Sequence, residues 1–310
     1  MPPDVALACR AVVKRYGDVV AVDGLDLHVL RGECFGLLGP NGAGKTTTIE
    51  MLEGLLAPDA GEVEVLGQRW ADAGAALRPR LGIQLQETQL ADKLSVEETL
   101  RLFRSFYPAG RAVPDLLALV GLESKAGAWV SKLSGGQRQR LSVACALVGA
   151  PDVLFLDEPT TGLDPQSRLQ LWDVLRRFKD DGGTILLTTH YMDEAATLCD
   201  RIGIVDRGKL IALGTPEALV QSLGTAHVVE VSFEGGTPPP VERLTALAGV
   251  VEARVADGVV SLGSAAIHET IPAVLAALAE AGLIVRELRT HSATLEDVFV
   301  ALTGRHLRDG

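Results

Sequence analysis

A glycine-rich segment that ends in a lysine and a threonine is the strongest chemical signal in this chain. Residues 39–46 read GPNGAGKT and match the pattern G-x-x-x-x-G-K-[ST] at every fixed position. Glycine lacks a Cβ, so such a backbone can pass close to an anion, and the N–H groups that open the next helix attract phosphate. The segment, here called the phosphate loop, predicts a nucleoside triphosphate site formed by Gly39, Pro40, Asn41, Gly42, Ala43, Gly44, Lys45, Thr46 and Thr47.

The sequence on either side supplies the setting that a phosphate loop requires. An apolar run at residues 34–38 predicts a buried strand before it, and residues 45–56 predict a helix after it. Lys45 is then expected to bridge the β and γ phosphates, and the Thr46 hydroxyl to bind Mg²⁺. An ordinary glycine turn before a helix is the structural alternative.

Two adjacent carboxylates close a second apolar segment. Residues 153–158 predict a strand that ends in Asp157 and Glu158, and open parallel sheets bind ligands at the carboxyl ends of their strands. Neighbouring side chains on a strand point to opposite faces, so the two acids are expected to have different roles. Asp157 is predicted to hold Mg²⁺, and Glu158 to polarise the water that attacks the γ-phosphate. The alternative is a pair of turn residues before Pro159.

A second glycine-rich segment, residues 133–137 with the sequence LSGGQ, precedes a helix-like stretch at residues 137–148. A hydroxyl and glycines at a helix start can form an anion site, although such a segment is also common as a flexible turn. One triphosphate bound at the phosphate loop has no obvious need for a second glycine-rich helix start from the same chain.

Taken in order, these segments resemble the ATP-binding subunit of an ABC (ATP-binding cassette) transporter over residues 5 to about 220. The resemblance implies that Tyr16 stacks on adenine and that Gln86 touches Mg²⁺ and the attacking water. It further implies that Asp164 couples two nucleotide sites and that His190 contacts the γ-phosphate. Each also has a structural alternative: packing for the tyrosine, solvation for the glutamine, helix capping for the aspartate and an architectural role for the histidine.

The same resemblance gives the LSGGQ segment a role. In such proteins two cassettes pair head to tail, and LSGGQ of one closes over the ATP held by the other. It therefore implies a homodimeric ATPase that uses ATP and Mg²⁺. Its site residues are Ser134, Gly135, Gly136 and Gln137 acting in trans, the catalytic set Lys45, Gln86, Glu158 and His190, and the metal ligands Thr46, Gln86 and Asp157.

Length and composition limit the classes of protein that this chain can belong to. A chain of 310 residues with 47% hydrophobic residues suits two domains with proper cores. It has no uninterrupted apolar stretch of the length a spanning helix needs, and residues 1–4 do not resemble a signal peptide. A net charge of −11 argues against a nucleic-acid partner. We therefore expect a cytoplasmic protein, attached to the inner face of the cell membrane through a membrane partner.

The predicted fold class is α/β with two domains. The resemblance implies a P-loop NTPase cassette at residues 1–223, with a mixed-sheet core, an antiparallel β subdomain and a helical subdomain at about 87–150. Residues 224–310 show the order strand, helix, strand, strand, helix, strand, with a hairpin turn at Asp257-Gly258. That order predicts a ferredoxin-like α+β domain with strands at 227–233, 250–256, 259–262 and 283–289 and helices at 241–248 and 267–281.

The end of the chain narrows the resemblance. Residues 291–305, HSATLEDVFVALTGR, and the TTGLDP segment at 160–165 are similar to ABC-2 type drug and antibiotic exporters such as the daunorubicin-resistance ATPases. This implies export of a drug or antibiotic through a separate ABC-2 permease. An importer ATPase and a soluble ABC ATPase without a transport role are the alternatives, and the tail could serve only to stabilise or dimerise the protein.

Overall fold

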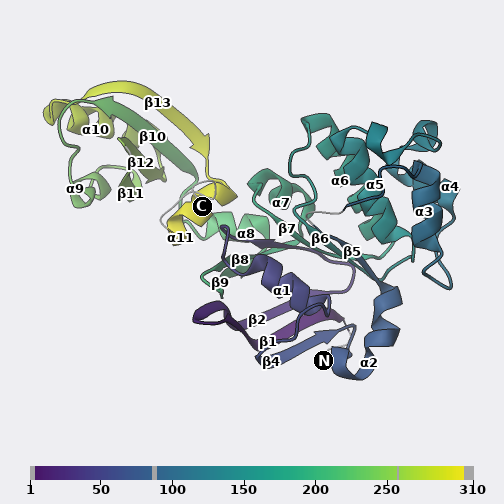
Figure 1. Cartoon of the computed structure of the whole chain (residues 1–310). Coiled ribbons are helices and arrows are strands. Elements are labelled where there is room, and N and C mark those ends of the chain that lie inside the picture. Colours follow the sequence, from purple (N-terminus) through teal and green to yellow (C-terminus); the bar gives the residue numbers. More distant parts are fainter. Residues whose placement is uncertain (1–3, 86–88, 257, 304–310) are drawn as a thin grey trace. The chain divides into compact units, whose positions relative to one another are not determined.

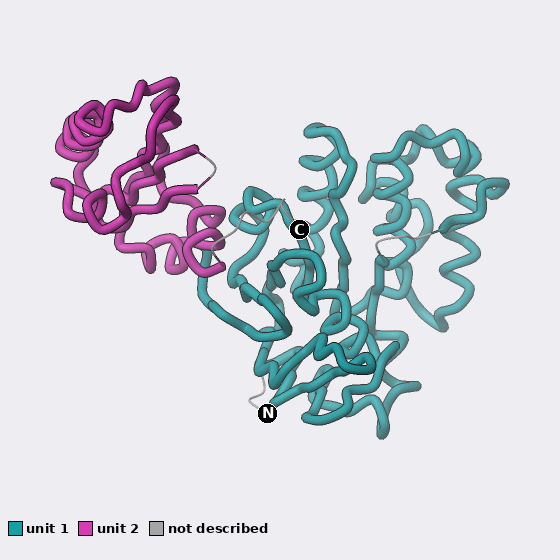
Figure 2. Tube along the Cα trace, turned by 60° about the vertical axis from the view of Figure 1, so that its left-hand side comes forward, with its two compact units in different colours: residues 1–216, 307–310 teal, residues 217–306 magenta. Residues whose placement is uncertain are grey.

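The computed structural model describes residues 4–85, 89–256 and 258–303, and the chain divides into two compact units (Figures 1 and 2). The first comprises residues 1–216 and 307–310, and the second residues 217–306. The division falls between Pro216 and Glu217, ahead of the boundary predicted after residue 223. Helix α8 (Pro216–Gln221) begins at this division.

The first unit is built on a six-stranded mixed sheet in the order β5-β6-β7-β3-β8-β9. The neighbours from β5 to β8 are parallel, and β9 pairs antiparallel with β8. The strands β3, β6 and β7 are buried throughout, as expected for parallel strands that are covered on both faces. Their carboxyl ends meet at one edge, so the segments that follow them are neighbours. The strands are β3 (Cys34–Leu38), β5 (Leu81–Gln84), β6 (Val153–Asp157), β7 (Thr184–Thr189), β8 (Arg201–Asp206) and β9 (Lys209–Gly214).

A three-stranded antiparallel sheet in the order β2-β1-β4 forms the second layer of this unit. Its strands are β1 (Val5–Tyr16), β2 (Val19–Leu30) and β4 (Ala60–Val65). Buried side chains of this sheet, such as Leu7 and Val29, belong to the same hydrophobic core as Phe35 and Phe155 of the six-stranded sheet. This shared core fixes helix α1 (Lys45–Leu52) at the end of β3 (Figure 1).

Helices complete the unit. α3, α4 and α5 lie together, and α5 contacts β5 and α6 (Figure 1). They form the predicted helical subdomain. The cassette architecture expected from the sequence is thus confirmed. The helices are α2 (Trp70–Leu77), α3 (Val96–Arg104), α4 (Val113–Val120), α5 (Gly135–Leu147), α6 (Pro165–Asp180) and α7 (Met192–Leu198), with short 3-10 turns at Arg78–Arg80, Glu123–Lys125 and Val130–Lys132. No helix in the described ranges has the length and apolar character needed to cross a membrane.

The second unit has the predicted ferredoxin-like topology. Its strands follow the order β11-β12-β10-β13, with every neighbouring pair antiparallel. The core beneath the helices includes Val229, Leu262 and Leu278. The elements are β10 (His227–Glu234), α9 (Val241–Thr245), β11 (Val250–Ala256), β12 (Val259–Ser264), α10 (Ile267–Glu280), β13 (Ile284–Ser292) and α11 (Leu295–Thr303). Asp257 of the predicted hairpin turn lies outside the described residues.

Three predicted helix boundaries were wrong. α9 ends at Thr245 rather than at residue 248, and the other two differences have a local reason. α1 stops at Leu52 rather than near residue 56, because Gly54 adopts a left-handed backbone with φ of +74° that ends the helix. α5 begins at Gly135 rather than at Gln137, because the Ser134 side chain caps the helix by accepting a hydrogen bond from the Gln137 N–H.

Candidate nucleotide site

The phosphate loop runs from the end of β3 to the start of α1, and two of its glycines are sterically required. A Cβ on Gly39 would lie 2.2 Å from the Val205 carbonyl oxygen, and one on Gly44 would lie 2.3 Å from the Ala21 carbonyl oxygen. Gly44 also has a left-handed backbone, with φ of +99°. No side chain in the described part of the chain caps α1, so its first-turn N–H groups remain available to an anion.

Lys45 places a buried ammonium group inside this loop. Its Nζ donates to the carbonyl oxygens of Gly39 at 2.7 Å and Pro40 at 3.1 Å, and the side chain is almost fully buried. Burial lowers the pKa of the Lys45 ammonium, while the carboxylates of Glu158 and Asp157 act in the opposite direction. A cation that is held by carbonyl oxygens can exchange them for phosphate oxygens, so the loop fits a triphosphate.

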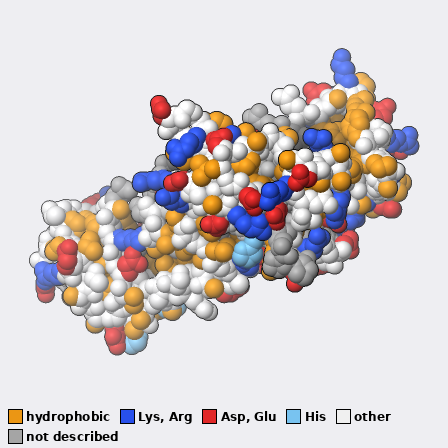
Figure 3. Space-filling view, turned by 90° about the horizontal axis from the view of Figure 1, so that it is seen from below, with side chains coloured by type: hydrophobic (Ala, Val, Ile, Leu, Met, Phe, Trp, Pro, Cys, Tyr) orange, Lys and Arg blue, Asp and Glu red, His pale blue; other side chains and the backbone are white. Residues whose placement is uncertain are grey.

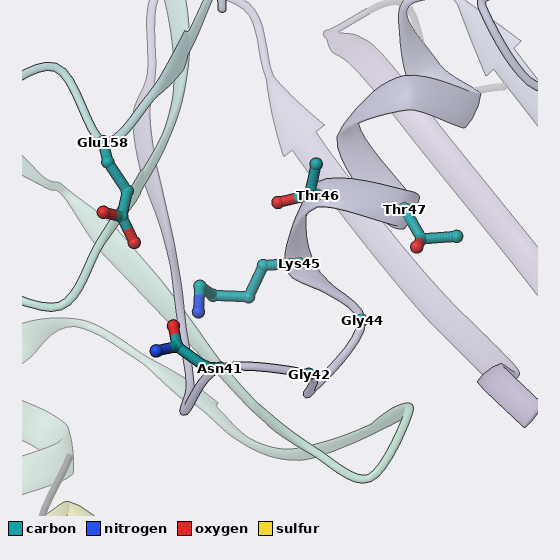
Figure 4. Close-up of a pocket in the computed structure, with 7 residues that line it drawn as sticks. All are labelled: Asn41, Gly42, Gly44, Lys45, Thr46, Thr47 and Glu158. Atoms are coloured by element: carbon teal, nitrogen blue, oxygen red, sulfur yellow. The ribbon is translucent and has the colours of Figure 1, made fainter. Parts of the chain in front are cut away.

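A cavity of about 170 Å³ opens over the loop (Figure 4). In that view the Thr46 hydroxyl points toward the side of Glu158, whereas Thr47 points away. The Lys45 side chain extends between the loop and Glu158. The lining residues are Asn41, Gly42, Gly44, Lys45, Thr46, Thr47 and Glu158.

Asp157 lies at the end of β6, between two hydroxyl groups. One carboxylate oxygen accepts a short hydrogen bond from the Thr188 hydroxyl, and the other lies 3.4 Å from the Thr46 hydroxyl. The parallel register of β6 and β7 pairs Asp157 with Thr188. A hydroxyl and a carboxylate are ligands that Mg²⁺ accepts, with phosphate oxygens and waters completing its octahedron. Thr46 and Asp157 therefore fit a Mg²⁺ site beside the phosphates.

Glu158 follows with a strained backbone, since its φ is +48° in a residue other than glycine. Its N–H donates to the Thr188 carbonyl oxygen at 3.2 Å and to the Thr188 hydroxyl at 3.1 Å. Its Oε2 accepts from the Thr161 hydroxyl at 3.1 Å and lies 3.2 Å from Nδ1 of His190. The strands β6 and β7 thus bring a carboxylate and an imidazole together beside the phosphate loop.

The LSGGQ segment forms a separate cluster at the starts of α5 and α6. Ser134 and Gln137 bond to each other's backbone N–H groups as a capping box, at 3.2 and 3.0 Å. Asp164 caps α6 through the Ser167 N–H at 3.0 Å and hydroxyl at 2.6 Å, and these hydrogen bonds lower the pKa of the Asp164 carboxyl. A Cβ on Gly136 would lie 2.3 Å from the Ser167 hydroxyl. None of the residues 134–137 or Asp164 lines the cavity over the phosphate loop.

His190 and Asp157 contact the lining residues Glu158 and Thr46 without lining the cavity themselves. The predicted roles of Tyr16 and Gln86 are not tested by the described structure. Tyr16 lies at the end of β1, about half exposed at 49%, with the Lys14 ammonium 5.9 Å from its ring centre. It does not line the cavity, so its contact with adenine stays a prediction. Gln86 lies outside the described residues, and its predicted roles stay predictions as well.

The sequence analysis missed the threonines around the two acids. Thr188 bonds both to the carboxylate of Asp157 and to the backbone of Glu158, and Thr161 bonds to the carboxylate of Glu158. Thr188 lies on β7, two residues before His190, and its proximity to Asp157 follows from the pairing of β6 with β7. Thr188 could have been identified only by predicting how β6 and β7 pair.

The surface carries side chains of both charges. On the face shown in Figure 3, Lys and Arg side chains lie interspersed with Asp and Glu. Many basic residues are engaged in ion pairs, for example Lys14 with Asp59 at 2.9 Å, Arg69 with Glu62 at 2.7 Å and Arg80 with Asp152 at 2.7 Å.

Comparison with known proteins agrees with this geometry. The family model described as ABC transporter matches residues 22–161. A Nod factor export ATP-binding protein I of Paraburkholderia xenovorans is 43% identical over 99% of this chain and 100% of its own length. That of Cupriavidus metallidurans is 44% identical over 98% of this chain and 99% of its own.

Solved structures give the same result. The ATP-binding subunit of an ABC transporter superposes with a TM-score of 0.65 at 31% identity, covering 71% of this chain and 93% of that one. A dimeric ATP-binding cassette in a post-hydrolysis state with ADP and Pi gives a TM-score of 0.62 at 25% identity, covering 67% of this chain and 98% of that one.

Proposed function

The chain belongs to the ABC transporter family and is an ATP-hydrolysing subunit, and we propose that two copies pair head to tail to drive export through a separate ABC-2 type membrane permease. One observation carries the pairing. Glu158, His190 and Lys45 gather at the phosphate loop, whereas the LSGGQ segment lies at the start of α5, against Ser167 of α6, and does not line that cavity. A second copy can supply the LSGGQ segment that one chain leaves unused.

In this proposal each side chain at the cavity has its own role in γ-phosphate hydrolysis. Glu158 accepts a proton from the attacking water, and His190, 3.2 Å from that carboxylate, contacts the γ-phosphate and holds the water in line. Lys45 exchanges its loop carbonyls for phosphate oxygens. Thr46 and Asp157 hold Mg²⁺, which neutralises charge on the phosphates when it is bound. Gln86 is the further ligand of the metal and water that the family resemblance implies.

The partner's LSGGQ segment then completes the site. Ser134 and Gly136 begin a helix whose N-terminal N–H groups can face the γ-phosphate held by the other copy, with Gly135 and Gln137 beside them. Asp164 lies next to Gly136 across the bound Ser167 and connects the two halves. Tyr16 is proposed to carry the adenine ring.

The exported molecule and the cellular location of the protein are proposed from its resemblance to ABC-2 type exporters. The tail of the chain supports a drug or antibiotic as the exported molecule, with the protein on the cytoplasmic face of the membrane beneath its permease. The full-length relatives carry the name Nod factor export ATP-binding protein I, which favours a Nod factor as a second candidate cargo. Co-expression with the membrane protein of the adjacent reading frame tests this choice. Drug resistance that is lost with Lys45→Ala supports the first cargo, and release of a Nod factor without drug resistance supports the second.

The experiment that tests the proposed mechanism is Glu158→Gln. We expect the variant to bind ATP and to accumulate as an ATP-dependent dimer in light scattering, while steady-state hydrolysis falls at least about 100-fold because the proton acceptor is gone. Glu50→Gln on α1, which does not line the cavity, is the control and should hydrolyse ATP at the wild-type rate. Hydrolysis by Glu158→Gln at the wild-type rate would contradict the role of Glu158, and a strictly monomeric ATP complex would contradict the pairing.

A further inference from the structure

A continuous stack of side chains leads from the start of α6 to the imidazole beside Glu158. The guanidinium carbon of Arg168 lies 4.4 Å from the centre of the Tyr191 ring. The Tyr191 ring in turn lies 4.1 Å from that of His190, centre to centre, with a tilt of 41°. Nδ1 of His190 is 3.2 Å from Oε2 of Glu158. The imidazole is therefore in contact with both a carboxylate and an aromatic ring.

Arg168 is itself fixed from two directions. Its N–H donates to the Asp164 carbonyl oxygen at 3.0 Å in the first turn of α6, and its Nη1 donates to Asp193 of α7 at 3.2 Å. Its side chain is only 20% exposed, and its Nε is buried. A guanidinium over a ring face is attracted by the ring's negative face, and the attraction grows as water is excluded. Arg168 therefore keeps the Tyr191 ring in one place.

Tyr191 has few other restraints of its own in the described structure. Its N–H donates to the Thr189 hydroxyl at 2.9 Å, which fixes the backbone of the turn between β7 and α7 but leaves the ring to its neighbours. The ring packs between Arg168 and His190. Loss of the guanidinium would let the ring turn away, and the imidazole would then lose its aromatic neighbour.

We propose that Arg168 and Tyr191 are positioning residues that hold the His190 imidazole in the geometry needed for hydrolysis. The inference rests on the proposed role of His190 at the γ-phosphate. Neither residue touches the cavity over the phosphate loop, so both act on turnover through His190 and leave nucleotide binding unchanged.

The test measures kcat and KM for ATP separately. Arg168→Ala and Tyr191→Leu are expected to lower kcat by roughly tenfold while KM stays within about twofold, because the stack orders a catalytic group and makes no contact with ATP. Tyr191→Phe keeps the ring and should retain the wild-type kcat. Tyr191→Leu serves as the second variant in case Arg168→Ala unfolds, and thermal unfolding of each variant shows that it is folded.

The chain offers a matched control on the same helix. Arg176 lies 6.0 Å from the Trp172 ring and 3.1 Å from Asp173, so it makes the same kinds of contact two turns further along α6. Arg176→Ala should leave kcat unchanged. A loss in Arg176→Ala equal to that in Arg168→Ala would reduce the effect to helix stability and overturn the proposal.

A double-mutant cycle in single-turnover conditions separates this inference from the role of His190 itself. In a His190→Ala background, Arg168→Ala should cost no further rate, because the group that it positions is absent. Two results would overturn this inference while leaving the role of His190 intact. One is an equal loss of rate for Arg168→Ala in the His190→Ala background and in the wild type. The other is a wild-type kcat for Arg168→Ala when His190→Ala is impaired. A wild-type rate for His190→Ala would remove the proposed role of His190, and the inference with it.

Discussion

Glu53, at the end of α1, carries a carboxyl group that should make the stability of the cassette depend on pH. It is only 3% exposed, and neither carboxylate oxygen has a hydrogen-bond partner within the described part of the chain. It contributes to the wall of a cavity of about 300 Å³ that Trp70 and Tyr107 also line. Burial, together with the negative charges of Asp157 and Glu50, raises the pKa of Glu53 from 4.5 to about 8.

The sign of the effect follows from where the proton is held more tightly. The folded chain keeps the Glu53 proton up to about pH 8, whereas the unfolded chain releases it near 4.5. The proton therefore favours the folded state, and its contribution to stability is lost as pH rises through this window and levels off above it. Since one pKa unit corresponds to about 1.4 kcal/mol, the wild-type free energy of unfolding should fall by roughly 2 kcal/mol between about pH 6 and about pH 8 from this group.

Glu53→Gln isolates that contribution, because the amide keeps the shape and cannot ionise. Urea unfolding of the nucleotide-free full chain can be followed by tryptophan fluorescence, since all three tryptophans, Trp70, Trp129 and Trp172, lie in the first unit. The stability of the variant relative to wild type should rise by about 2 kcal/mol over the same pH range, whatever its offset at low pH. Glu123→Gln, at an exposed residue that is not among the causes of this shift, is the control and should show no such slope. Parallel stability curves for Glu53→Gln and wild type would refute the account of the buried acid.

Two further variants test the nucleotide site and the LSGGQ cluster. Lys45→Ala removes the ammonium from the phosphate loop and should weaken ATP affinity by at least about tenfold in a fluorescent-nucleotide titration, and unchanged affinity would contradict the assignment of the loop. Gly136→Ala places a Cβ 2.3 Å from the Ser167 hydroxyl and should destabilise the cassette by about 1–3 kcal/mol and impair the ATP-dependent dimer. Gly135→Ala is the control for stability, because its Cβ meets nothing within 4 Å. Ser167→Gly should restore the stability of the Gly136→Ala variant. Equal destabilisation by the two glycine variants would contradict the packing argument.

What the sequence predicted well depends on local pattern. The phosphate loop, its strand and its helix start, and the order of elements in the ferredoxin-like unit could all be predicted because glycine spacing and apolar runs encode them within short segments. The end of α1 was placed too late because the apolar pattern continues through Leu55 and Leu56, and the left-handed Gly54 between them and the helix overrides that pattern.

The features of the site that the sequence did not predict depend on contacts between residues that are distant in sequence. Thr188 meets Asp157 only because β7 pairs with β6 in one register, and a shift of one residue would turn its hydroxyl to the opposite face. The strained φ of Glu158 and the approach of Arg168 to Tyr191 likewise arise from the way strands and helices pack, about which residue spacing carries no information.

The first turn of α6 is where the two halves of the proposed dimeric site meet within one chain. Ser167 lies against Gly136 of the LSGGQ segment and is bound by Asp164, whereas Arg168, the next residue, stacks on Tyr191 beside His190. In a head-to-tail dimer the LSGGQ segment faces the partner's ATP, and His190 faces the chain's own. A displacement of Ser167 when LSGGQ engages the partner's nucleotide must also move Arg168, because both belong to one rigid helical turn. In the proposed dimer, the closeness of these contacts would give each nucleotide site a direct physical means of responding to the other.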